Sequence, residues 1–381
     1  MGIFHNKKMK KVAIYQNTIS QGGRIRVIAY MTECLNAMGI TPDWISYRNS
    51  FKSKDLENMH HVPLNANIRI INAWNKGLGE YKYIKMNKIM DKMNTEYDLI
   101  INSNNTMSGI KNGKYFLHFI YFPREARVLK KYTNSVYKHS ISNWFFRKLY
   151  SIHPKPIHKN KILGISQFTI CAIQKVFQYP QDQIELIYPP ITFKKKKLTD
   201  FFNKKNFVVS IGRFDTNKDQ ISQIKIAQKN PHLLFNICGY TPNSQSNNYF
   251  NDCESLIRGR KISNVRLVKN ATSEELEKIL IESKFFLHTM KDEPFGLGTV
   301  EAILHGCIPL VHASGGSNEI VNNPELMFRS IDEGSKRLKA KSKINSEDYS
   351  KLIKSLQERV REFDENNFCR IFTDNLMTLL K

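Results

Sequence analysis

Short apolar runs alternate with helical patterns along the whole chain of 381 residues. A helix is predicted from Arg24 to about Met38. Apolar runs of the first half predict strands, and in order they are KKVAIYQN, DWISYR, YDLIINS, KYFLHFIYF, NKILGIS and IELIYPP. Because helical segments lie between most of these runs, the pattern predicts an α/β fold with a parallel sheet and helices on both faces.

A stretch rich in proline and lysine interrupts this alternation at residues 188–206, YPPITFKKKKLTDFFNKKN. Beyond it, strands are predicted at FVVSIG, HLLFNICG, NVRLV, KFFLHT, CIPLVH and LMFRS. Helices are predicted around residues 217–229, 246–258, 273–283, 298–305, 316–322, 346–363 and 366–380. The stretch therefore predicts a linker between two Rossmann-like domains. We expect these domains at residues 1–190 and 191–365, with a C-terminal helix at 366–381 that packs back towards the first domain.

Polar loops follow the predicted strands in both halves. In the second half they include GRFDTNK and TMKDEPFG, and in the first half NTISQGG, NSNNT and HFIYFPR. Ligands of open α/β sheets bind beyond the carboxyl ends of the strands. The two sets of loops predict a site in a cleft between the domains.

The segment DEPFGLGTVEAILHGCIPLV combines two carboxylates with a glycine-rich turn. Glu293 and Glu301 stand eight positions apart, with Gly296 and Gly298 between them, just before a predicted helix. Glycines lower the bulk around backbone N–H groups, and a helix N-terminus favours an anion. Carboxylates do not bind phosphate, but they do accept hydrogen bonds from hydroxyls. The segment therefore predicts a ligand with both groups, a nucleotide or a sugar phosphate.

This segment resembles the Glu-x7-Glu motif of the retaining GT-B glycosyltransferases of family 4, the glycosyl transferases group 1. The resemblance extends to an upstream Arg-x4-Lys, Arg213 to Lys218, and to a downstream Gly-Gly-x-x-Glu that begins at Gly315. It implies two Rossmann-like domains that face each other across a cleft. The first would take the acceptor and the second the donor. The implied reaction moves a sugar from a nucleoside diphosphate sugar to a hydroxyl acceptor with retention of configuration.

The resemblance also implies roles for the residues around the turn. Glu301 would bind the donor ribose hydroxyls, and Glu293 would lie at the sugar end of the donor. Gly296 and Leu297 would offer backbone N–H groups to the phosphates. No covalent nucleophile is assigned.

Arg213 and Lys218 resemble the pair that neutralises the leaving diphosphate in this family. Negative charge grows on the diphosphate as its bond to the sugar breaks, and two fixed cations stabilise that charge. The family usually has glycine after the lysine, whereas this chain has Asp219. Because the sequence also has no Asp-x-Asp motif, we expect neither a metal ion nor a cofactor.

The first half supplies the acceptor-side residues that the resemblance implies. Gly22 and Gly23 match a glycine loop near donor and acceptor, and His118 matches a strand-end histidine beside the reacting sugar. Taken alone, a histidine among aromatics is more often a satisfied core residue. Ser166 matches another family position, although it reads more simply as a helix N-cap. Further acceptor-side candidates from the polar loops are Asn104, Tyr121 and Arg124.

The formal net charge of +24 is concentrated in the first half of the chain. Residues 1–190 hold 28 Lys+Arg and 11 Asp+Glu, or +17, whereas residues 191–381 hold 30 and 23, or +7. The excess indicates an anionic partner or a compositional bias. A nucleic-acid-binding protein is one alternative function, although no such motif is present. The other alternative function is that of another GT-B enzyme, such as a sugar-nucleotide epimerase or a phosphorylase.

Residues 124–161 place ten Lys+Arg and one acid around Trp144, Phe145, Phe146 and Tyr150. Cations beside aromatic rings suit an anionic membrane surface, although these rings would equally suit a core. No apolar run approaches the roughly 18 residues of a membrane span. The six cysteines form no CxxC pair and are expected to be reduced. These observations predict a cytoplasmic protein and leave open a peripheral position on the inner face of a membrane.

Overall fold

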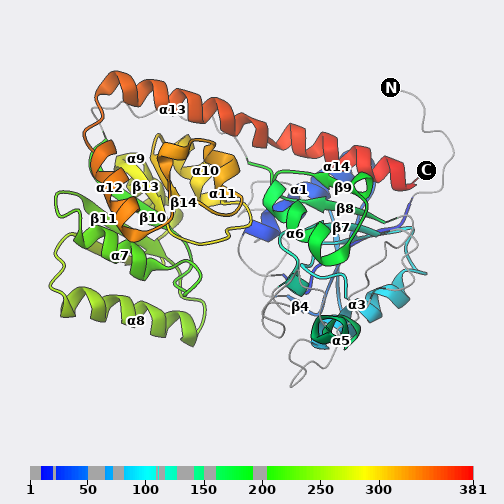
Figure 1. The fold of residues 1–381 in the computed structure, drawn as a ribbon. Helices are drawn as coiled ribbons and strands as arrows, with labels where there is room; N and C mark the ends of the chain where they lie inside the picture. Colours follow the sequence, from blue (N-terminus) through cyan, green and yellow to red (C-terminus); the bar gives the residue numbers. More distant parts are fainter. Residues whose placement is uncertain are drawn as a thin grey trace. The chain divides into compact units, whose positions relative to one another are not determined.

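The computed structural model places most of the chain in two compact units, which are shown in Figure 1. Unit 1 comprises residues 1–192 and 363–381, and unit 2 comprises residues 193–362. The described residues are 10–19, 23–49, 65–71, 81–108, 110, 116–126, 141–149, 160–191 and 204–380.

Unit 1 contains a parallel sheet of seven strands in the order β5-β3-β1-β6-β7-β8-β9. Its strands are β1 Val12–Tyr15, β3 Asp43–Ser46, β5 Asn67–Ile70, β6 Leu99–Asn102, β7 Phe116–Ile120, β8 Lys161–Gly164 and β9 Ile184–Leu186. All six strands predicted in this half are present. The unpredicted β5 lies at the sheet edge, where none of its four side chains is fully buried, so it lacks an apolar run.

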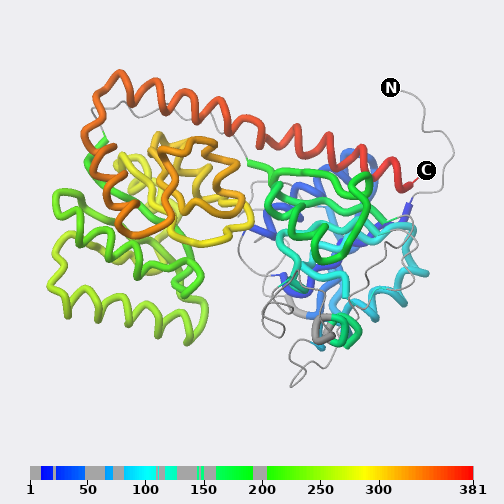
Figure 2. The backbone as a smooth tube through the Cα atoms, in the orientation of Figure 1, coloured from blue at the N-terminus to red at the C-terminus, as the bar shows by residue number. Residues whose placement is uncertain are grey.

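Five described helices of at least nine residues accompany this sheet: α1 Gly23–Ala37, α3 Tyr81–Met93, α5 Ile141–Leu149, α6 Gln167–Phe177 and α14 Glu365–Leu380. A small parallel pair, β2 Thr18–Ile19 with β4 Arg48–Asn49, lies beside it in the fold. The predicted helix from Arg24 is α1. Figure 2 shows the blue start and the red end of the chain together in unit 1.

Unit 2 contains a parallel sheet of six strands in the order β12-β11-β10-β13-β14-β15. The strands are β10 Lys205–Ile211, β11 Leu234–Gly239, β12 Val265–Lys269, β13 Ser283–His288, β14 Ile308–His312 and β15 Met327–Phe328. In both units the strand order reverses beside the first strand, as in a Rossmann fold. The reversal lies between β1 and β6 in unit 1 and between β10 and β13 in unit 2. The predicted fold class of two Rossmann-like domains is confirmed.

The helices of unit 2 are α7 Gln220–Gln228, α8 Ser244–Gly259, α9 Ser273–Glu282, α10 Leu297–Leu304, α11 Ser317–Val321, α12 Ile331–Lys341 and α13 Ser346–Val360. All except α12 correspond to predicted helices. Helix α12 is polar and has Gly334 in its interior, so its apolar periodicity is weak. The signal that marks it is a cap, because Ser330 accepts a hydrogen bond from the backbone N–H of Glu333 at 3.2 Å.

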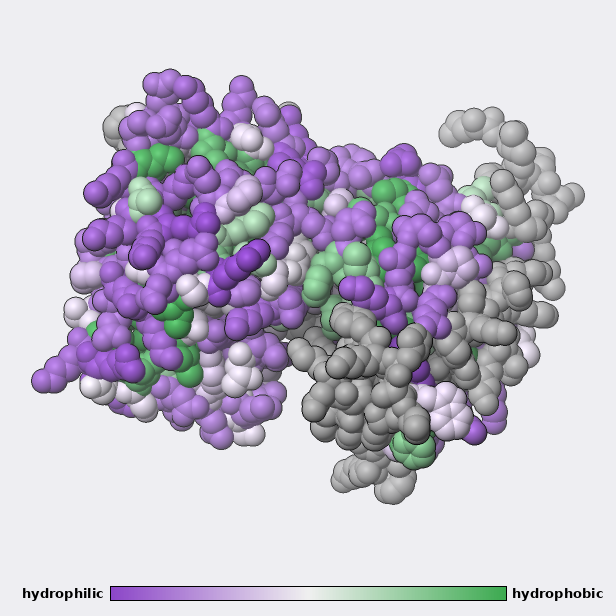
Figure 3. All heavy atoms as spheres, in the orientation of Figure 1, coloured by the Kyte–Doolittle hydropathy of each residue, from purple (hydrophilic) through white to green (hydrophobic). Residues whose placement is uncertain are grey.

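The central strands carry the cores of both units. All six side chains of β13 are buried, and Phe285 and Phe286 have no exposed surface. Burial of each such ring contributes about 1.5–3 kcal/mol relative to exposure. In the view of Figure 3, hydrophilic side chains cover most of the described surface, and hydrophobic ones appear in small separate patches.

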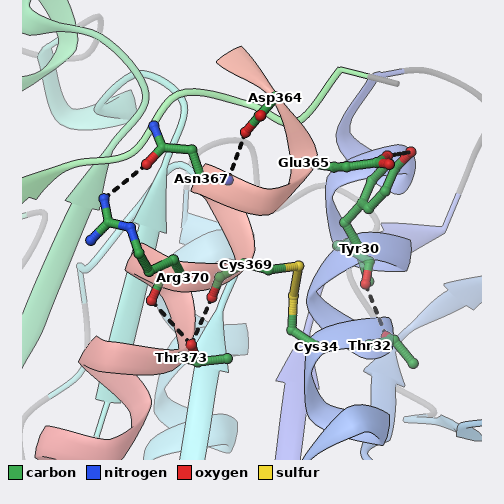
Figure 4. Close-up of a disulfide and its surroundings, with 10 residues drawn as sticks. Tyr30, Thr32, Cys34, Asp364, Glu365, Asn367, Cys369, Arg370 and Thr373 are labelled. Atoms are coloured by element: carbon green, nitrogen blue, oxygen red, sulfur yellow. Dashed lines mark hydrogen bonds between the residues drawn. A yellow bond between two sulfur atoms is a disulfide. The ribbon is translucent and has the colours of Figure 1, made fainter. Parts of the chain in front are cut away.

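The C-terminal helix α14 packs on α1 within unit 1, and a disulfide joins Cys34 to Cys369 (Figure 4). Their Cα atoms lie 5.8 Å apart. The Tyr30 hydroxyl adds a hydrogen bond of 3.0 Å to the Glu365 carboxylate. The expectation that all cysteines are reduced is therefore wrong. The pair is 335 positions apart in sequence, so no local spacing marks it.

The disulfide also removes the argument that placed the chain in the cytoplasm, because that argument required reduced cysteines. Four cysteines stay free: Cys171 is exposed, whereas Cys238, Cys253 and Cys307 are buried. Within the described ranges, no helix is both long enough and apolar enough to cross a bilayer.

Candidate functional site

The reversal of strand order in unit 2 brings two loops to the same edge of the sheet. We call residues 212–219, which follow β10, the β10 loop, and residues 289–296, which follow β13, the β13 loop. The pairing of Val208 with Phe285 and of Val209 with Phe286 sets β10 and β13 side by side. Because the strands are parallel, both loops leave from their carboxyl ends, where ligands bind in this fold.

Asp215 organises the β10 loop. Its carboxylate accepts hydrogen bonds from the backbone N–H groups of Asn217 and Lys218, each at 3.0 Å. It also accepts one from Nε of Arg213 at 2.5 Å. The Arg213 side chain keeps 46% of its surface exposed, so its remaining N–H donors can reach a ligand. The sequence reasoning missed Asp215, although an aspartate in a turn commonly binds the backbone N–H two residues further on.

Asp219 stands where the resemblance leads us to expect glycine. Its backbone conformation suits both glycine and aspartate. Its φ of 53° lies in the left-handed region, which favours glycine and tolerates aspartate. The side chain caps α7, since it accepts a hydrogen bond from the backbone N–H of Ser222 at 3.2 Å. The turn therefore has a backbone conformation that glycine would also adopt readily.

Lys218 and Glu293 form an ion pair between the two loops, with Nζ 2.5 Å from Oε2. Their side chains are 27% and 13% exposed. Gly212 makes room for the lysine stem, because a Cβ at this position would lie only 3.3 Å from Cδ of Lys218. The predicted site residues Lys218 and Glu293, 75 positions apart, are thus in direct contact.

His288, the last residue of β13, binds the same carboxylate oxygen from the other side, with Nε2 3.1 Å from Oε2 of Glu293. Burial lowers the pKa of His288, so the imidazole is neutral near pH 7. Because a carboxylate only accepts hydrogen bonds, we assign the imidazole proton to Nε2. The sequence reasoning missed His288, although it stands at the end of a buried apolar strand.

Glu293 is ionised in this environment. Burial raises the pKa of its carboxyl, but the hydrogen bond from His288 and the charge of Lys218 outweigh burial and lower the pKa to about 2. The site therefore presents a fixed negative charge beside a fixed positive one.

Thr289 ties the two loops together. Its hydroxyl lies within hydrogen-bond distance of the backbone carbonyls of Lys218, at 2.9 Å, and Asp219, at 3.0 Å. It also accepts a hydrogen bond of 3.0 Å from the amide of Gln223 on α7. Thr289 thus fastens the β13 loop to the backbone of the β10 loop. This link adds to the ion pair between Lys218 and Glu293.

Gly315 and Gly316 allow the backbone after β14 to approach the β13 loop. The N–H of Gly316 donates to the carbonyl of Glu293 at 2.7 Å. A Cβ at Gly315, where φ is 82°, would lie 2.5 Å from that carbonyl oxygen, and one at Gly316 would lie 2.4 Å from the carbonyl oxygen of Pro294. Their packing role is therefore direct, because any larger residue would push Glu293 away from Lys218.

Helix α10 begins where the β13 loop ends. Gly296 is its N-cap with a φ of 116°, and Leu297 is its first residue. The N-terminal N–H groups of a helix have no partner within the helix, and they attract anions. Glu301 lies on the second turn of α10 and is half-buried. Glu301 and the turn that the sequence predicts to bind phosphate therefore belong to the same helix.

His118 lies inside the sheet of unit 1, in the middle of β7 and without exposed surface. Its Nδ1 is 3.0 Å from the amide nitrogen of Asn102, and its Nε2 is 3.3 Å from that of Asn160. Burial lowers the pKa of His118 to about 3. His118 therefore lies within the strand and not at its end, as the alternative of a core histidine expects, and its role beside the reacting sugar stays a prediction.

Asn104 also has a visible structural task. It is buried, its side-chain oxygen accepts from the N–H of Asn17 at 2.8 Å, and its amide donates to the carbonyl of Tyr15 at 3.3 Å. It thereby joins the carboxyl ends of β1 and β6. Ser166 is the N-cap of α6, since it accepts from the N–H of Thr169 at 3.0 Å, so the simpler reading of this residue is confirmed.

Tyr121 and Arg124 follow the carboxyl end of β7. The Tyr121 hydroxyl donates to the carbonyl of Arg24 at 3.3 Å, and the Arg24 guanidinium lies 5.3 Å from the centre of the Tyr121 ring. Arg124 stacks 3.7 Å from the ring centre of Tyr83. Gly23 is the first residue of α1, and Gly22 lies outside the described residues.

Glu125, next to Arg124, is a buried carboxylate that the sequence reasoning missed. It accepts four hydrogen bonds, from the hydroxyls of Thr106 and Ser108 and from the backbone N–H groups of Met107 and Ser108, over 2.7–3.0 Å. It binds the loop after β6 to the turn after β7. In the part of the chain that is described, no group of three or more His, Cys, Asp or Glu is placed to hold a metal ion.

Residues 192–366 match the family described as glycosyl transferases group 1. This match covers unit 2, which holds the ion pair and helix α10, and it supports a group 1 glycosyltransferase.

Two curated relatives carry the description GDP-Man:Man(3)GlcNAc(2)-PP-Dol alpha-1,2-mannosyltransferase. The one from Xenopus laevis is 33% identical over 148 residues, which are 35% of this chain and 30% of the relative. The human one is 25% identical over 220 residues, which are 51% of this chain and 44% of the relative. The matching segments thus span less than half the length of these relatives.

Solved structures share the fold over nearly the whole chain. Anabaena HepE, in complex with UDP and glucose, has a TM-score of 0.71 at 14% identity and covers 97% of this chain and 100% of its own. WaaG, a glycosyltransferase involved in lipopolysaccharide biosynthesis, has a TM-score of 0.68 at 14% identity. The match covers 95% of this chain and 99% of WaaG. The fold is GT-B.

Proposed function

We propose that this protein transfers a sugar from a nucleoside diphosphate sugar to a hydroxyl acceptor, with retention of configuration and without a metal ion. The observation that carries the proposal is the contact between Lys218, Glu293 and His288 at the reversal of strand order in unit 2. Helix α10, which carries Glu301, begins at Leu297, four residues after Glu293. A diphosphate between two sugars needs these groups: cations and N–H donors for phosphate, and carboxylates for hydroxyls.

The cations act on the leaving group. As the bond between sugar and diphosphate breaks, the charge that grows on the diphosphate meets Lys218, Arg213 and the N-terminus of α10. Asp215 and Glu293 hold the two cations in place before the reaction, so little reorganisation is required during it. This arrangement raises turnover more than affinity, because the charge is largest in the transition state.

Glu293 serves as a fixed negative charge near the sugar. Its carboxylate is ionised and already bound by Lys218 and His288, so it stabilises positive charge at the reacting carbon from a set position. Retention then follows from departure and attack on one face, with the leaving phosphate accepting the acceptor proton.

Guanosine diphosphate mannose is the donor to test first, and a lipid-linked diphosphate sugar is the acceptor to test first. Both follow from the printed description of the two curated relatives. The basic first half of the chain is consistent with an acceptor that carries phosphate.

The proposal includes peripheral binding to an anionic membrane through α5. Trp144 is 63% exposed on this helix and Phe145 is 53% exposed. Lys148 lies beside them, with Nζ 5.3 Å from the Trp144 ring centre. Arg147 donates to the carbonyl of Val176 at 2.6 Å and so fastens α5 to α6. Exposed aromatics next to cations suit the headgroup layer. Phe146 and Tyr150, expected to share this role, lie outside the described side chains.

A nucleotide-sugar assay tests the reaction. Purified protein is incubated with GDP-mannose, UDP-glucose or UDP-GlcNAc and a prenyl diphosphate-linked acceptor, and nucleotide release and product linkage are measured. We expect one donor to give a product whose anomeric configuration equals that of the donor, in the presence of a chelator. An inverted product or a chelator-sensitive rate contradicts the mechanism, and an epimerised nucleotide sugar or phosphorolysis supports the alternative GT-B enzymes.

Liposome flotation tests the membrane surface. We expect flotation with anionic vesicles at low salt, and a large loss for Trp144→Ala with Phe145→Ala. Tyr81→Ala on α3 is the matched control, because Tyr81 is also an exposed aromatic, at 43%. Equal flotation on neutral vesicles, or an equal loss for the control, overturns this part of the proposal.

A further inference from the structure

Tyr240 is the one exposed aromatic side chain among residues 204–362, the described part of unit 2. It keeps 48% of its surface exposed and stands directly after β11, which ends at Gly239. Other aromatic rings of this unit, such as Phe214 and Phe250, are buried in its core. An aromatic ring that remains exposed just beyond the carboxyl end of a parallel strand is placed where ligands bind in this fold.

The backbone beneath this ring is held firmly. The carbonyl of Tyr240 accepts from the N–H of Phe214 at 3.1 Å. On the other side, the N–H of Asn270 donates to the carbonyl of Gly239 at 2.7 Å, and the Asn270 side chain accepts from the N–H of Thr241 at 3.0 Å. Asn270 adopts a left-handed φ of 55°, which asparagine tolerates. The backbone that carries the ring is therefore fixed on both sides.

The edge of the sheet carries three kinds of group in a fixed order. Tyr240 follows β11, Arg213 and Lys218 follow β10, and Glu293 follows β13. These strands are neighbours in the order β11-β10-β13, and strands of one sheet lie about 4.8 Å apart. The order is aromatic, cationic, anionic. A nucleoside diphosphate sugar has its parts in the same order: base, diphosphate, sugar.

We infer that the ring of Tyr240 is the stacking platform for the base of the donor nucleotide. The inference rests on the proposed function and adds a donor-binding residue to it. Stacking on one aromatic face accepts any base, because every base has a π-face. Tyr240 therefore supplies affinity for the nucleoside, and discrimination between bases falls to polar groups around it.

Calorimetric titration with GDP, UDP and inorganic pyrophosphate tests this inference. We expect Tyr240→Ala to weaken the binding of GDP and of UDP about tenfold or more, and to leave the binding of pyrophosphate unchanged. Tyr240→Phe keeps the ring and should bind as the unaltered protein does. Lys218→Ala is the contrasting variant, because it should weaken the binding of the nucleotides and of pyrophosphate alike.

A tryptophan at the same position gives a spectroscopic signal. The three tryptophans of the chain are Trp44, Trp74 and Trp144, all in the sequence of unit 1. The substitution Tyr240→Trp thus places a reporter in unit 2, and we expect its fluorescence to be quenched by GDP and UDP but not by pyrophosphate.

The outcomes separate the inference from the function on which it rests. If the unaltered protein binds a nucleotide and Tyr240→Ala binds it equally well, the stacking role is wrong and the proposed function stands. If Tyr240→Ala weakens pyrophosphate as much as GDP, the residue shapes the loop instead of stacking on the base. If the unaltered protein binds no nucleotide, both the inference and the proposed function fail.

Discussion

The two units have the same strand order around their first strand, yet the edges at which that order reverses differ in chemistry. In unit 2 the edge carries Lys218 and Glu293, an ion pair with part of its surface exposed. In unit 1 the corresponding edge carries Asn17 and Asn104, both buried; the Asn104 amide binds the backbone of Asn17 and Tyr15, and the Asn17 side chain accepts a hydrogen bond from the Tyr15 hydroxyl. Among the described residues, the loops that follow the two central strands carry an ion pair in unit 2 and buried amides in unit 1, so we expect the charge-dependent chemistry in unit 2.

The largest expected effect concerns the covalent link that only unit 1 has. Cys34→Ser, or reduction of the protein, should lower the free energy of unfolding of unit 1 by about 4 kcal/mol, because the disulfide closes a very long loop in the unfolded chain. Urea unfolding with and without a reductant measures it. Cys171→Ser, at a free exposed cysteine, is the control and should have no effect. Loss of stability in unit 2 instead of unit 1 would contradict the comparison.

His118→Ala should lower the free energy of unfolding by about 3–4 kcal/mol, because it leaves a cavity and removes the ring that the buried amides of Asn102 and Asn160 contact. Thermal unfolding measures the loss. Turnover per folded molecule should change little. A stable variant with a strongly reduced turnover would restore the catalytic role that the sequence had suggested.

Glu293 should give unit 2 a stability that acid removes. Its pKa falls from 4.5 to about 2 on folding, so its carboxylate stabilises the folded state above pH 4.5 and loses this effect as the pH falls towards 2. The shift corresponds to about 3 kcal/mol. Denaturant unfolding at pH 7 and pH 3 should show the difference between the unaltered protein and Glu293→Gln shrinking with acid. A constant difference would mean that the ion pair contributes no net stability.

Lys218→Ala should lower turnover about 100-fold, which is near 2.7 kcal/mol of transition-state stabilisation, and should change donor affinity less. Single-turnover rates and donor titrations separate the two quantities. Lys205→Ala is the matched control, because Lys205 also forms an ion pair, 3.1 Å from Glu282, but stands at the opposite end of β10. Equal losses in both variants would assign the effect to general electrostatics.

Glu301→Ala should weaken donor binding about tenfold, because a charged acceptor of ribose hydroxyls contributes about 1.5 kcal/mol or more. Calorimetric titration measures the dissociation constant, and Glu301→Gln should retain part of the affinity. An unchanged constant would remove Glu301 from the donor site and leave the N-terminus of α10 as the contact.

Much of the fold was predictable because its strands are buried on both faces and therefore appear as continuous apolar runs. The polar edge strand β5 and the polar helix α12 lack such runs, so they escaped prediction. Glu293 and Lys218 were found through a motif. Asp215 and His288 were not, because their importance depends on which residue faces them after folding.

His118 shows the opposite case, in which a motif position and a structural environment disagree. The sequence placed it among apolar and aromatic residues, which fits both a core and a site. The contacts of Asn102 and Asn160 with its ring favour the core, and neither asparagine is a neighbour of His118 in sequence. The link between Cys34 and Cys369 was hidden for the same reason, since packing and not spacing brings them together.

The division of unit 1 into residues 1–192 and 363–381 affects the order in which the protein can fold during synthesis. A ribosome delivers the chain from its N-terminus, and domains generally fold as units while they emerge. Unit 2 is one continuous segment, so it can fold as soon as Glu362 has emerged. Unit 1 begins first but finishes last, because Ile191 pairs with the backbone at Phe363 and Asp364, and Cys34 must wait for Cys369. The nascent protein therefore carries an incomplete first domain, with the α1 surface uncovered, throughout the synthesis of its second.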